Sequence, residues 1–225
     1  MKIMNFQEKL ESIKQRIEGN MPPSYLKIMH KATHDLEKSG IQNKVLKVGQ
    51  KAPAFELFNQ NGETISSEEL LSKGMLVLTF YRGVWCPYCN ADLANLKKYV
   101  PEIEETGATL LGISPELPQF LKKISAMQKL NFDILHDEKN ALAAQFGLKF
   151  FYPQDLKELY RDKFNINLEV QQGNDEWALP MPARFVIDQE GIIRYAESKA
   201  DYRNRPNPDE LMSVLNNLKI KNLTA

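Results

Sequence analysis

The sequence predicts an α/β fold in which a central mixed sheet is flanked by helices and preceded by a helical extension. Three apolar runs, residues 75–81, 108–114 and 132–137, have the composition of buried strands and alternate with segments of helical periodicity. Such alternation is typical of right-handed crossover units and a largely parallel sheet. Residues 183–198 contain two further strand-like runs around DQEG, which predicts a terminal hairpin with antiparallel strands.

The composition is that of an ordinary globular protein. The chain has 225 residues, of which 43% are hydrophobic and 26% charged, and its formal net charge is zero. This balance gives no electrostatic case for nucleic acid or an anionic membrane as a partner. No window reaches the roughly 18 apolar residues of a membrane span, and the N-terminus lacks the apolar segment of a secretory signal. We therefore expect a cytoplasmic protein that binds neither nucleic acid nor membrane.

Residues 1–45 are expected to form the helical extension, and residues 46–222 the main domain. Apolar residues recur in the first helix at intervals of three and four: Ile3, Phe6, Leu10, Ile13 and Ile17. GNMPP interrupts this helix, and Ser24 is expected to cap a second one that ends near Gly40. Because the apolar stripe must be buried, the extension either packs on the main domain or forms the interface of a homodimer.

Within the main domain, NQNG at residues 59–62 predicts a first hairpin. A helix is expected over residues 87–105, where Pro101 should kink it or end it early because proline cannot donate the helical hydrogen bond. Residues 149–178 are less regular and are interpreted as an insertion. Further helices are expected over residues 116–130, 138–147, 153–164 and 207–220.

Both cysteines of the chain, Cys86 and Cys89, lie in FYRGVWCPYC, where the first buried strand turns into its helix. The first turn of a helix presents unpaired N–H groups and a partial positive charge, which stabilise a thiolate. The C-x-x-C spacing also brings the two sulfurs within reach of a disulfide. Pro87 suits the helix start because it has no N–H to leave unpaired. Position and spacing together predict dithiol redox chemistry.

Two other interpretations of the cysteines are open. Two inert buried cysteines would be a coincidence at such a junction. Zinc could be held by Cys86 and Cys89 together with His30 and His34, which are spaced i, i+4, but the order and separation of these residues do not match a zinc finger. We expect no metal and no cofactor. His136 follows the third strand and is interpreted as a structural residue in preference to a functional one.

Four segments resemble the peroxiredoxin group of the thioredoxin-fold superfamily. They are APAFEL, VLTFYRGVWCPYCNADLANL, LLGISPE and MPARFVIDQEGIIRYA. The chain is most similar to the peroxiredoxin-like branch of alkyl hydroperoxide reductase and thiol-specific antioxidant relatives that carries C-x-x-C. The resemblance runs from about residue 47 to residue 220. It implies a thioredoxin fold and thiol chemistry on peroxides or disulfides.

The departures from the family pattern bear on the site. Ordinary peroxiredoxins have P-x-x-x-T-x-x-C after the central strand. In this chain the peroxidatic cysteine of that pattern falls on Cys89, the threonine on Cys86 and the proline on Arg82. The family's arginine at the start of the later strand is matched by Pro182, which resembles the cis-proline of thioredoxins. The bond between Met181 and Pro182 is therefore a candidate cis peptide.

Two arginines, Arg82 and Arg184, could replace the missing family arginine. A guanidinium near the dithiol would stabilise a thiolate and donate hydrogen bonds to a peroxide oxygen. Arg82 directly follows the strand, so we expect it to be catalytic with the two cysteines, although a salt-bridged structural role is the alternative. The candidate substrate-binding residues are Tyr81, Trp85, Pro182 and Arg184.

The resemblance implies a thiol-dependent peroxidase that reduces hydrogen peroxide or organic hydroperoxides through a dithiol–disulfide cycle. One thiolate becomes a sulfenic acid, the other cysteine condenses with it, and a thiol such as thioredoxin or glutathione reduces the pair. Alignment indicates Cys89 as the attacking residue. The alternative is a thioredoxin-like protein disulfide oxidoreductase in which Cys86 attacks. A second alternative is a weakly catalytic binding module that recruits a partner through its helical extension.

Overall fold

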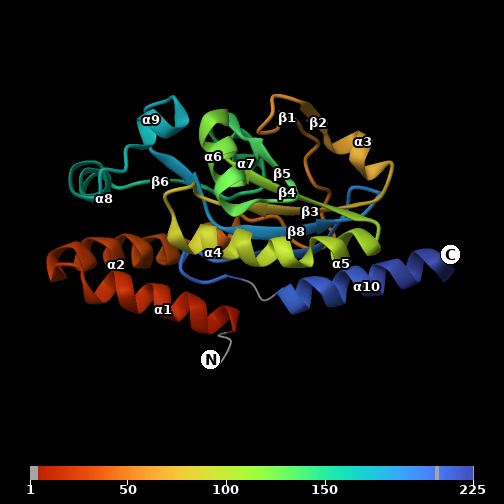
Figure 1. The fold of residues 1–225 in the computed structure, drawn as a ribbon, viewed down its shortest axis with the longest axis horizontal. Helices are drawn as coiled ribbons and strands as arrows, with labels where there is room; N and C mark the ends of the chain where they lie inside the picture. Colours follow the sequence, from red (N-terminus) through yellow and green to blue (C-terminus); the bar gives the residue numbers. More distant parts are fainter. Residues whose placement is uncertain (1–4, 206–207, 225) are drawn as a thin grey trace.

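A five-stranded mixed sheet forms the centre of the computed structural model, which describes residues 5–205 and 208–224 (Figure 1). The strand order is β5-β4-β3-β8-β9. The strands are β3 (Met75–Phe80), β4 (Ala108–Ser114), β5 (Asp133–His136), β8 (Ala183–Ile187) and β9 (Ile193–Ser198). β3, β4 and β5 are parallel, whereas β8 is antiparallel to both β3 and β9. The predicted mixed sheet and terminal hairpin are confirmed.

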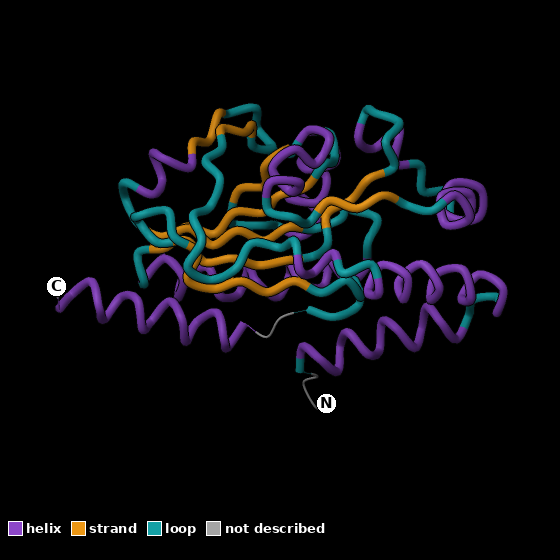
Figure 2. The backbone as a smooth tube through the Cα atoms, turned by 180° about the vertical axis from the view of Figure 1, so that it is seen from behind, coloured by secondary structure: helices purple, strands orange, loops and turns teal. Residues whose placement is uncertain are grey.

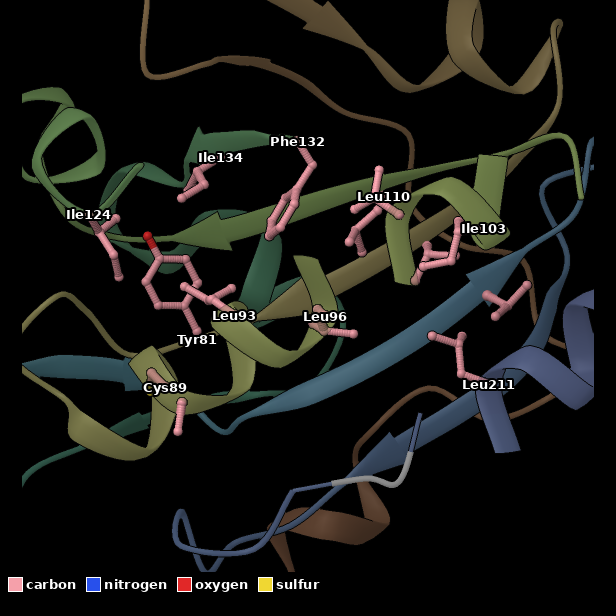
Figure 3. Packing of buried hydrophobic residues seen from close by; sticks show 14 of the residues in the cluster. Tyr81, Cys89, Leu93, Leu96, Ile103, Leu110, Ile124, Phe132, Ile134 and Leu211 are labelled. Atoms are coloured by element: carbon pink, nitrogen blue, oxygen red, sulfur yellow. The ribbon is translucent and has the colours of Figure 1, made fainter. Parts of the chain in front are cut away.

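The two faces of the sheet carry separate hydrophobic cores because side chains alternate along each strand. In β3 every residue is buried: Met75 and Val77 lie in one core, and Leu76 and Leu78 in the other. Figure 3 shows the first core, where Leu93 and Ile103 pack on the sheet. The helices over this face are α4 (Pro87–Leu96), α5 (Val100–Glu105), α6 (Pro118–Gln128) and α10 (Pro208–Thr224). The predicted first residue of α10, residue 207, lies outside the described residues.

The helix expected over residues 87–105 is broken. α4 ends at Leu96, a 3-10 turn η2 (Lys97–Tyr99) follows, and Pro101 lies in the first turn of α5. A proline at position 101 has no N–H for the carbonyl of residue 97, and its ring clashes with that carbonyl in a regular helix. The predicted interruption is therefore confirmed, and it begins a full turn before the proline.

The extension forms two helices, α1 (Phe6–Gly19) and α2 (Pro23–Lys38). A capping box between Asn5 and Glu8 starts α1, and the side chain of Leu10 is buried in the core under α4. The stripe of α1 thus packs on the rest of the chain from Phe6 to Ile17, as the first of the two interpretations expected, whereas Ile3 lies outside the described residues.

The prediction that Ser24 caps α2 is wrong. The helix begins at Pro23, and Pro22 occupies the capping position without a side-chain hydrogen bond. Prolines suit this place because the first turn of a helix leaves its N–H groups unpaired in any case.

Residues 149–178 form a separate aromatic layer beside α2. β6 (Lys149–Phe151) pairs antiparallel with β7 (Ala178–Pro180), and Tyr152, Tyr160 and Trp177 pack together next to them. Figure 2 shows α2 and this insertion at the same end of the molecule. The insertion also contains α8 (Gln154–Glu158), a π-helical turn η4 (Leu159–Lys163) and α9 (Leu168–Gln172). The predicted helix over residues 153–164 corresponds to α8 and η4.

The remaining elements are short and cover the second core. They are η1 (Ile41–Asn43), β1 (Glu56–Phe58), β2 (Thr64–Ser66), α3 (Ser67–Leu71), η3 (Glu138–Asn140) and α7 (Ala141–Gln145). The antiparallel pair of β1 and β2 confirms the hairpin predicted at NQNG. In the part of the chain that the structure describes, no helix has the length and apolar content needed to span a membrane.

Gly147 fixes the contact between the end of α7 and the chain that leads out of the extension. Its φ of +76° suits glycine, and a Cβ here would lie 2.1 Å from the carbonyl oxygen of Lys44. We predict that Gly147→Ala lowers the free energy of unfolding by about 3 kcal/mol or more, because strain and a backbone clash add. Gly62→Ala, at φ +85° with nothing within 4 Å, should cost only about 1 kcal/mol. Urea unfolding of both variants measures this difference, and equal losses would contradict it.

Candidate active site

The two thiols lie where the sequence places them, at the start of α4. Cys86 is the N-terminal capping residue, and its Sγ accepts the backbone N–H of Cys89 at 3.4 Å. The two Sγ atoms are 2.8 Å apart, both thiols are free, and both side chains are buried. A small closing movement is therefore enough to form a disulfide.

The thiols differ in their tendency to ionise. Burial raises the pKa of Cys86, but the hydrogen bond from Cys89 and the charges of Arg82 and Arg205 outweigh it and lower that pKa to about 6. Burial and the adjacent Cys86 sulfur raise the pKa of Cys89 well above its usual range. At neutral pH the pair therefore holds one thiolate, on Cys86, with the proton on Cys89.

Arg205 was missed by the sequence reasoning. It lies between β9 and α10, far from the cysteines in sequence, yet its Nη2 donates to Cys89 Sγ at 3.2 Å. Its Nε lies 3.6 Å from the carboxylate of Asp92, one turn along α4. Only the cluster of arginines at residues 203–205 could have drawn attention to it, and nothing in that cluster links it to the thiols.

Arg184 does not contact either sulfur. It is fully buried on β8, and its Nη2 donates to both carboxylate oxygens of Asp92, at 2.9 and 3.0 Å. Asp92 thus joins Arg184 to Arg205, and Arg205 in turn contacts Cys89. The residue expected to bind substrate instead belongs to the buried ion network behind the thiols.

Arg82 is held by aromatic groups. Its guanidinium lies over the rings of Trp85 and Tyr202, at 4.7 and 4.0 Å from their centroids, and its Nη2 donates to the hydroxyl of Tyr160 at 3.2 Å. No carboxylate is paired with it in the described part of the chain, so the alternative of a salt-bridged arginine is not what the structure contains. Its positive charge instead lowers the pKa of Cys86.

A cavity of about 190 Å³ leads to Cys86. Its wall includes Arg82, Trp85, Tyr160 and Tyr202, with apolar side chains from α1 and α2. Cys86 is part of this wall, whereas Cys89 is not among its described residues. The cavity therefore lies on the Cys86 side of the dithiol.

Two other candidates for substrate binding lie away from this cavity. Tyr81 is buried in the core beneath α4, and Figure 3 shows its hydroxyl directed toward Ile124. Pro182 does not have the predicted cis bond, since no peptide bond in the described ranges is cis. The N–H of Met181 donates to the carbonyl of Leu148 at 2.9 Å, so the chain stays extended from β7 into β8 and makes no tight turn there.

His30, one of the two histidines of the zinc interpretation, contacts Glu18 and Arg203. His30 Nε2 is 3.0 Å from the carboxylate of Glu18 and 3.1 Å from Arg203. No group of three His, Cys, Asp or Glu side chains suited to a metal occurs among the residues that are described. His136 Nδ1 is hydrogen-bonded to the backbone carbonyl of Glu116 at 2.7 Å, which is a structural role.

Glu116 is a second residue that the sequence reasoning did not single out. Its carboxyl is buried, and Oε2 accepts the N–H of Val84 at 2.8 Å, while Oε1 has no partner among the described residues. A Cβ on Gly83 would lie 2.6 Å from that Oε1, so only glycine allows the approach. Burial raises the pKa of Glu116 to about 8, although the hydrogen bond from the N–H of Val84 acts in the opposite direction. This carboxyl is therefore mostly neutral at pH 7.

The fold and the dithiol define a thioredoxin-fold protein of the peroxiredoxin type. The AhpC/TSA family model matches residues 48–196, and the chain belongs to this family. It is 31% identical over 148 residues to the putative peroxiredoxin bcp of Haemophilus influenzae, covering 64% of this chain and 95% of that protein. It is also 31% identical over 127 residues to peroxiredoxin Bcp of Escherichia coli, covering 55% and 81%.

Solved structures show the same fold. The crystal structure of peroxidoxin BcpB from Mycobacterium tuberculosis has a TM-score of 0.60 at 23% identity, and the match covers 77% of this chain and 98% of that one. Peroxiredoxin Q of Xanthomonas campestris has a TM-score of 0.56 at 17% identity, covering 73% and 91%. The family match leaves α1 and α2 outside it, together with Tyr202 and Arg205.

The raised pKa of Glu116 predicts a pH-dependent cost to stability. The unfolded chain ionises this carboxyl near its ordinary value of 4.5, whereas the folded chain keeps its proton up to about pH 8. Folding therefore favours the protonated carboxyl. Its contribution to the free energy of unfolding is fully present below pH 4.5, and the free energy of unfolding falls by up to about 5 kcal/mol as the pH rises to 8. Glu116→Gln should remove this slope.

The measurement is urea unfolding of the wild type and Glu116→Gln at several values between pH 5 and 8. Cys86 titrates in both proteins, so the difference between the two curves isolates the carboxyl. Glu68→Gln, at an exposed position of α3, controls for the substitution itself. Parallel curves for the wild type and Glu116→Gln would show that the carboxyl is ionised in the folded protein.

Proposed function

We propose that this protein is a thiol-dependent peroxidase that reduces hydrogen peroxide or organic hydroperoxides, with Cys86 as the attacking thiol. The observation that carries the proposal is the position of Cys86: it holds the thiolate and belongs to the lining of the cavity, and the second thiol lies 2.8 Å from its sulfur. Membership of the AhpC/TSA family supports the reaction class. Alignment with ordinary peroxiredoxins favours Cys89, but the geometry and the charge distribution favour Cys86.

The reaction proceeds in two steps. The Cys86 thiolate attacks the terminal oxygen of the hydroperoxide, an S–O bond forms, the O–O bond breaks, and the alkoxide takes up a proton to leave as the alcohol. The Cys89 sulfur then attacks Cys86, forming the S–S bond and breaking the S–O bond. The hydroxide that leaves takes the proton of Cys89 and becomes water. Arg82, which lines the same cavity, stabilises the thiolate and the departing oxyanion.

A thiol reductant such as thioredoxin or glutathione closes the cycle by attacking the disulfide. One structural neighbour, a yeast mitochondrial 1-Cys peroxiredoxin, is described as resolved through glutathione and thioredoxin systems. The cytoplasmic location and the homodimer remain predictions from the sequence. Because the apolar stripe of α1 packs on α4, a homodimer would use the outer faces of the extension.

The second candidate is a protein disulfide oxidoreductase in which Cys86 attacks a disulfide. The lowered pKa of Cys86 would serve that reaction equally well. However, the sulfur is buried at the end of a cavity of about 190 Å³, which admits a small molecule more readily than a protein disulfide. The weakly catalytic binding module has no specific support, since such a module does not need a thiolate next to two arginines.

We predict that one equivalent of hydrogen peroxide converts the reduced protein to an intramolecular Cys86–Cys89 disulfide, detected by mass spectrometry. In Cys89→Ser the reaction should stop at a sulfenic acid on Cys86, because the condensing thiol is missing. Cys86→Ser is the matched variant. It should not form sulfenic acid at the rate at which Cys89→Ser forms it, because the attacking thiol is missing. Sulfenic acid in Cys86→Ser alone would reassign the attack to Cys89. Thiols that resist peroxide but are oxidised by a disulfide substrate would favour the oxidoreductase.

A further inference from the structure

A second, larger cavity adjoins the one that leads to Cys86. It has a volume of about 400 Å³ and lies between α2 and the 149–178 insertion, and its wall includes Ala32, Leu36, Phe150 and Leu156. The wall is mainly apolar. A volume of this size is within the range of sites for small organic ligands.

The two cavities share a wall of four residues, Met29, Arg82, Tyr160 and Tyr202. Arg82 is buried there, and its Nε has no partner in the described structure. A molecule that occupies the larger cavity therefore contacts Arg82, the cationic side chain among these four residues. Arg82 also lines the smaller cavity, and Cys86 is part of that cavity's wall. The arrangement places an apolar cavity directly beside the one that Cys86 lines.

We propose that the larger cavity binds the apolar group of a bulky organic hydroperoxide and directs its peroxide group past Arg82 to Cys86. This inference rests on the proposed peroxidase function and assigns the preference among hydroperoxides to a subsite between α2 and the 149–178 insertion. Hydrogen peroxide is little larger than water, which occupies about 30 Å³, so it leaves the larger cavity unused. Ala32 and Met29 on α2 then determine specificity, and α2 lies outside the part of the chain that matches the family.

The reaction at Cys86 is the same as that of the proposed peroxidase cycle. The O–O bond of the hydroperoxide breaks, its terminal oxygen goes to Cys86, and the alkoxide takes a proton and leaves as an apolar alcohol. The Cys89 sulfur then forms the S–S bond with Cys86, the S–O bond breaks, and the hydroxide that leaves takes the proton of Cys89 to become water. The apolar group itself forms and breaks no bond. The cavity therefore affects only the binding and orientation of the hydroperoxide.

The test compares two oxidants in single turnovers of the pre-reduced protein, so that no reductant is needed. Tryptophan fluorescence follows oxidation, because Trp85 lies in the wall beside Cys86. Ala32→Phe fills the larger cavity and should slow cumene hydroperoxide about tenfold, a size typical of steric changes in apolar pockets. Its rate with hydrogen peroxide should change by less than about twofold. Ala32→Leu, which is milder for folding, should lie between the wild type and Ala32→Phe.

The matched control is Ala52→Phe. Ala52 lines an unrelated cavity of about 310 Å³ that also contacts Leu76, at the opposite end of β3 from the thiols. This variant should leave the ratio of the two rates unchanged. Equal slowing of both oxidants by Ala32→Phe and Ala32→Leu, or no slowing of cumene hydroperoxide, would overturn the inference. If the wild type reacts with neither oxidant, the proposed peroxidase function itself fails, which is a distinct result.

Discussion

A buried thiolate between two buried guanidinium groups is the interaction on which the site depends. Arg82 and Arg205 both lower the pKa of Cys86, and the N-terminus of α4 adds its own partial positive charge. Buried cations are costly unless they are compensated. Aromatic faces compensate Arg82, and Asp92 compensates Arg184 and Arg205 together. Asp92 pairs with Arg184 and Arg205 but not with Arg82, so the Cys86 thiolate supplies a negative charge near Arg82 that no described carboxylate provides.

The surrounding fold brings these groups together. Arg82 and the two cysteines follow the carboxyl end of β3 in one short stretch. The parallel neighbour β4 ends at Ser114, so Glu116 lies beside this stretch and accepts the N–H of Val84. The extension and the insertion then cover the site and shape the two cavities that meet at Arg82. Helices α1 and α2 therefore form part of the site's wall and are more than an appendage to the sheet.

Local patterns in the sequence were enough to predict the sheet, the broken helix and the place of the dithiol, because period, proline and glycine act on neighbouring residues. The roles of Arg205 and Glu116 were not predictable, since each arises from contacts between segments far apart in the chain. The expected cis bond at Pro182 was wrong because it rested on a likeness to thioredoxins, whereas the chain here stays extended. Arg184 was expected to take the place of the family arginine near the dithiol, but its hydrogen bonds go to Asp92 and to neither sulfur.

The central claim is that Cys86, and not Cys89, carries the thiolate at neutral pH. The most direct measurement is the rate at which iodoacetamide alkylates each cysteine of the reduced wild type as a function of pH, with the modified residue identified by mass spectrometry. We expect Cys86 to react first, with a half-maximal rate near pH 6. A profile at Cys86 centred above about pH 8, as for an ordinary thiol, or faster alkylation of Cys89, would contradict it.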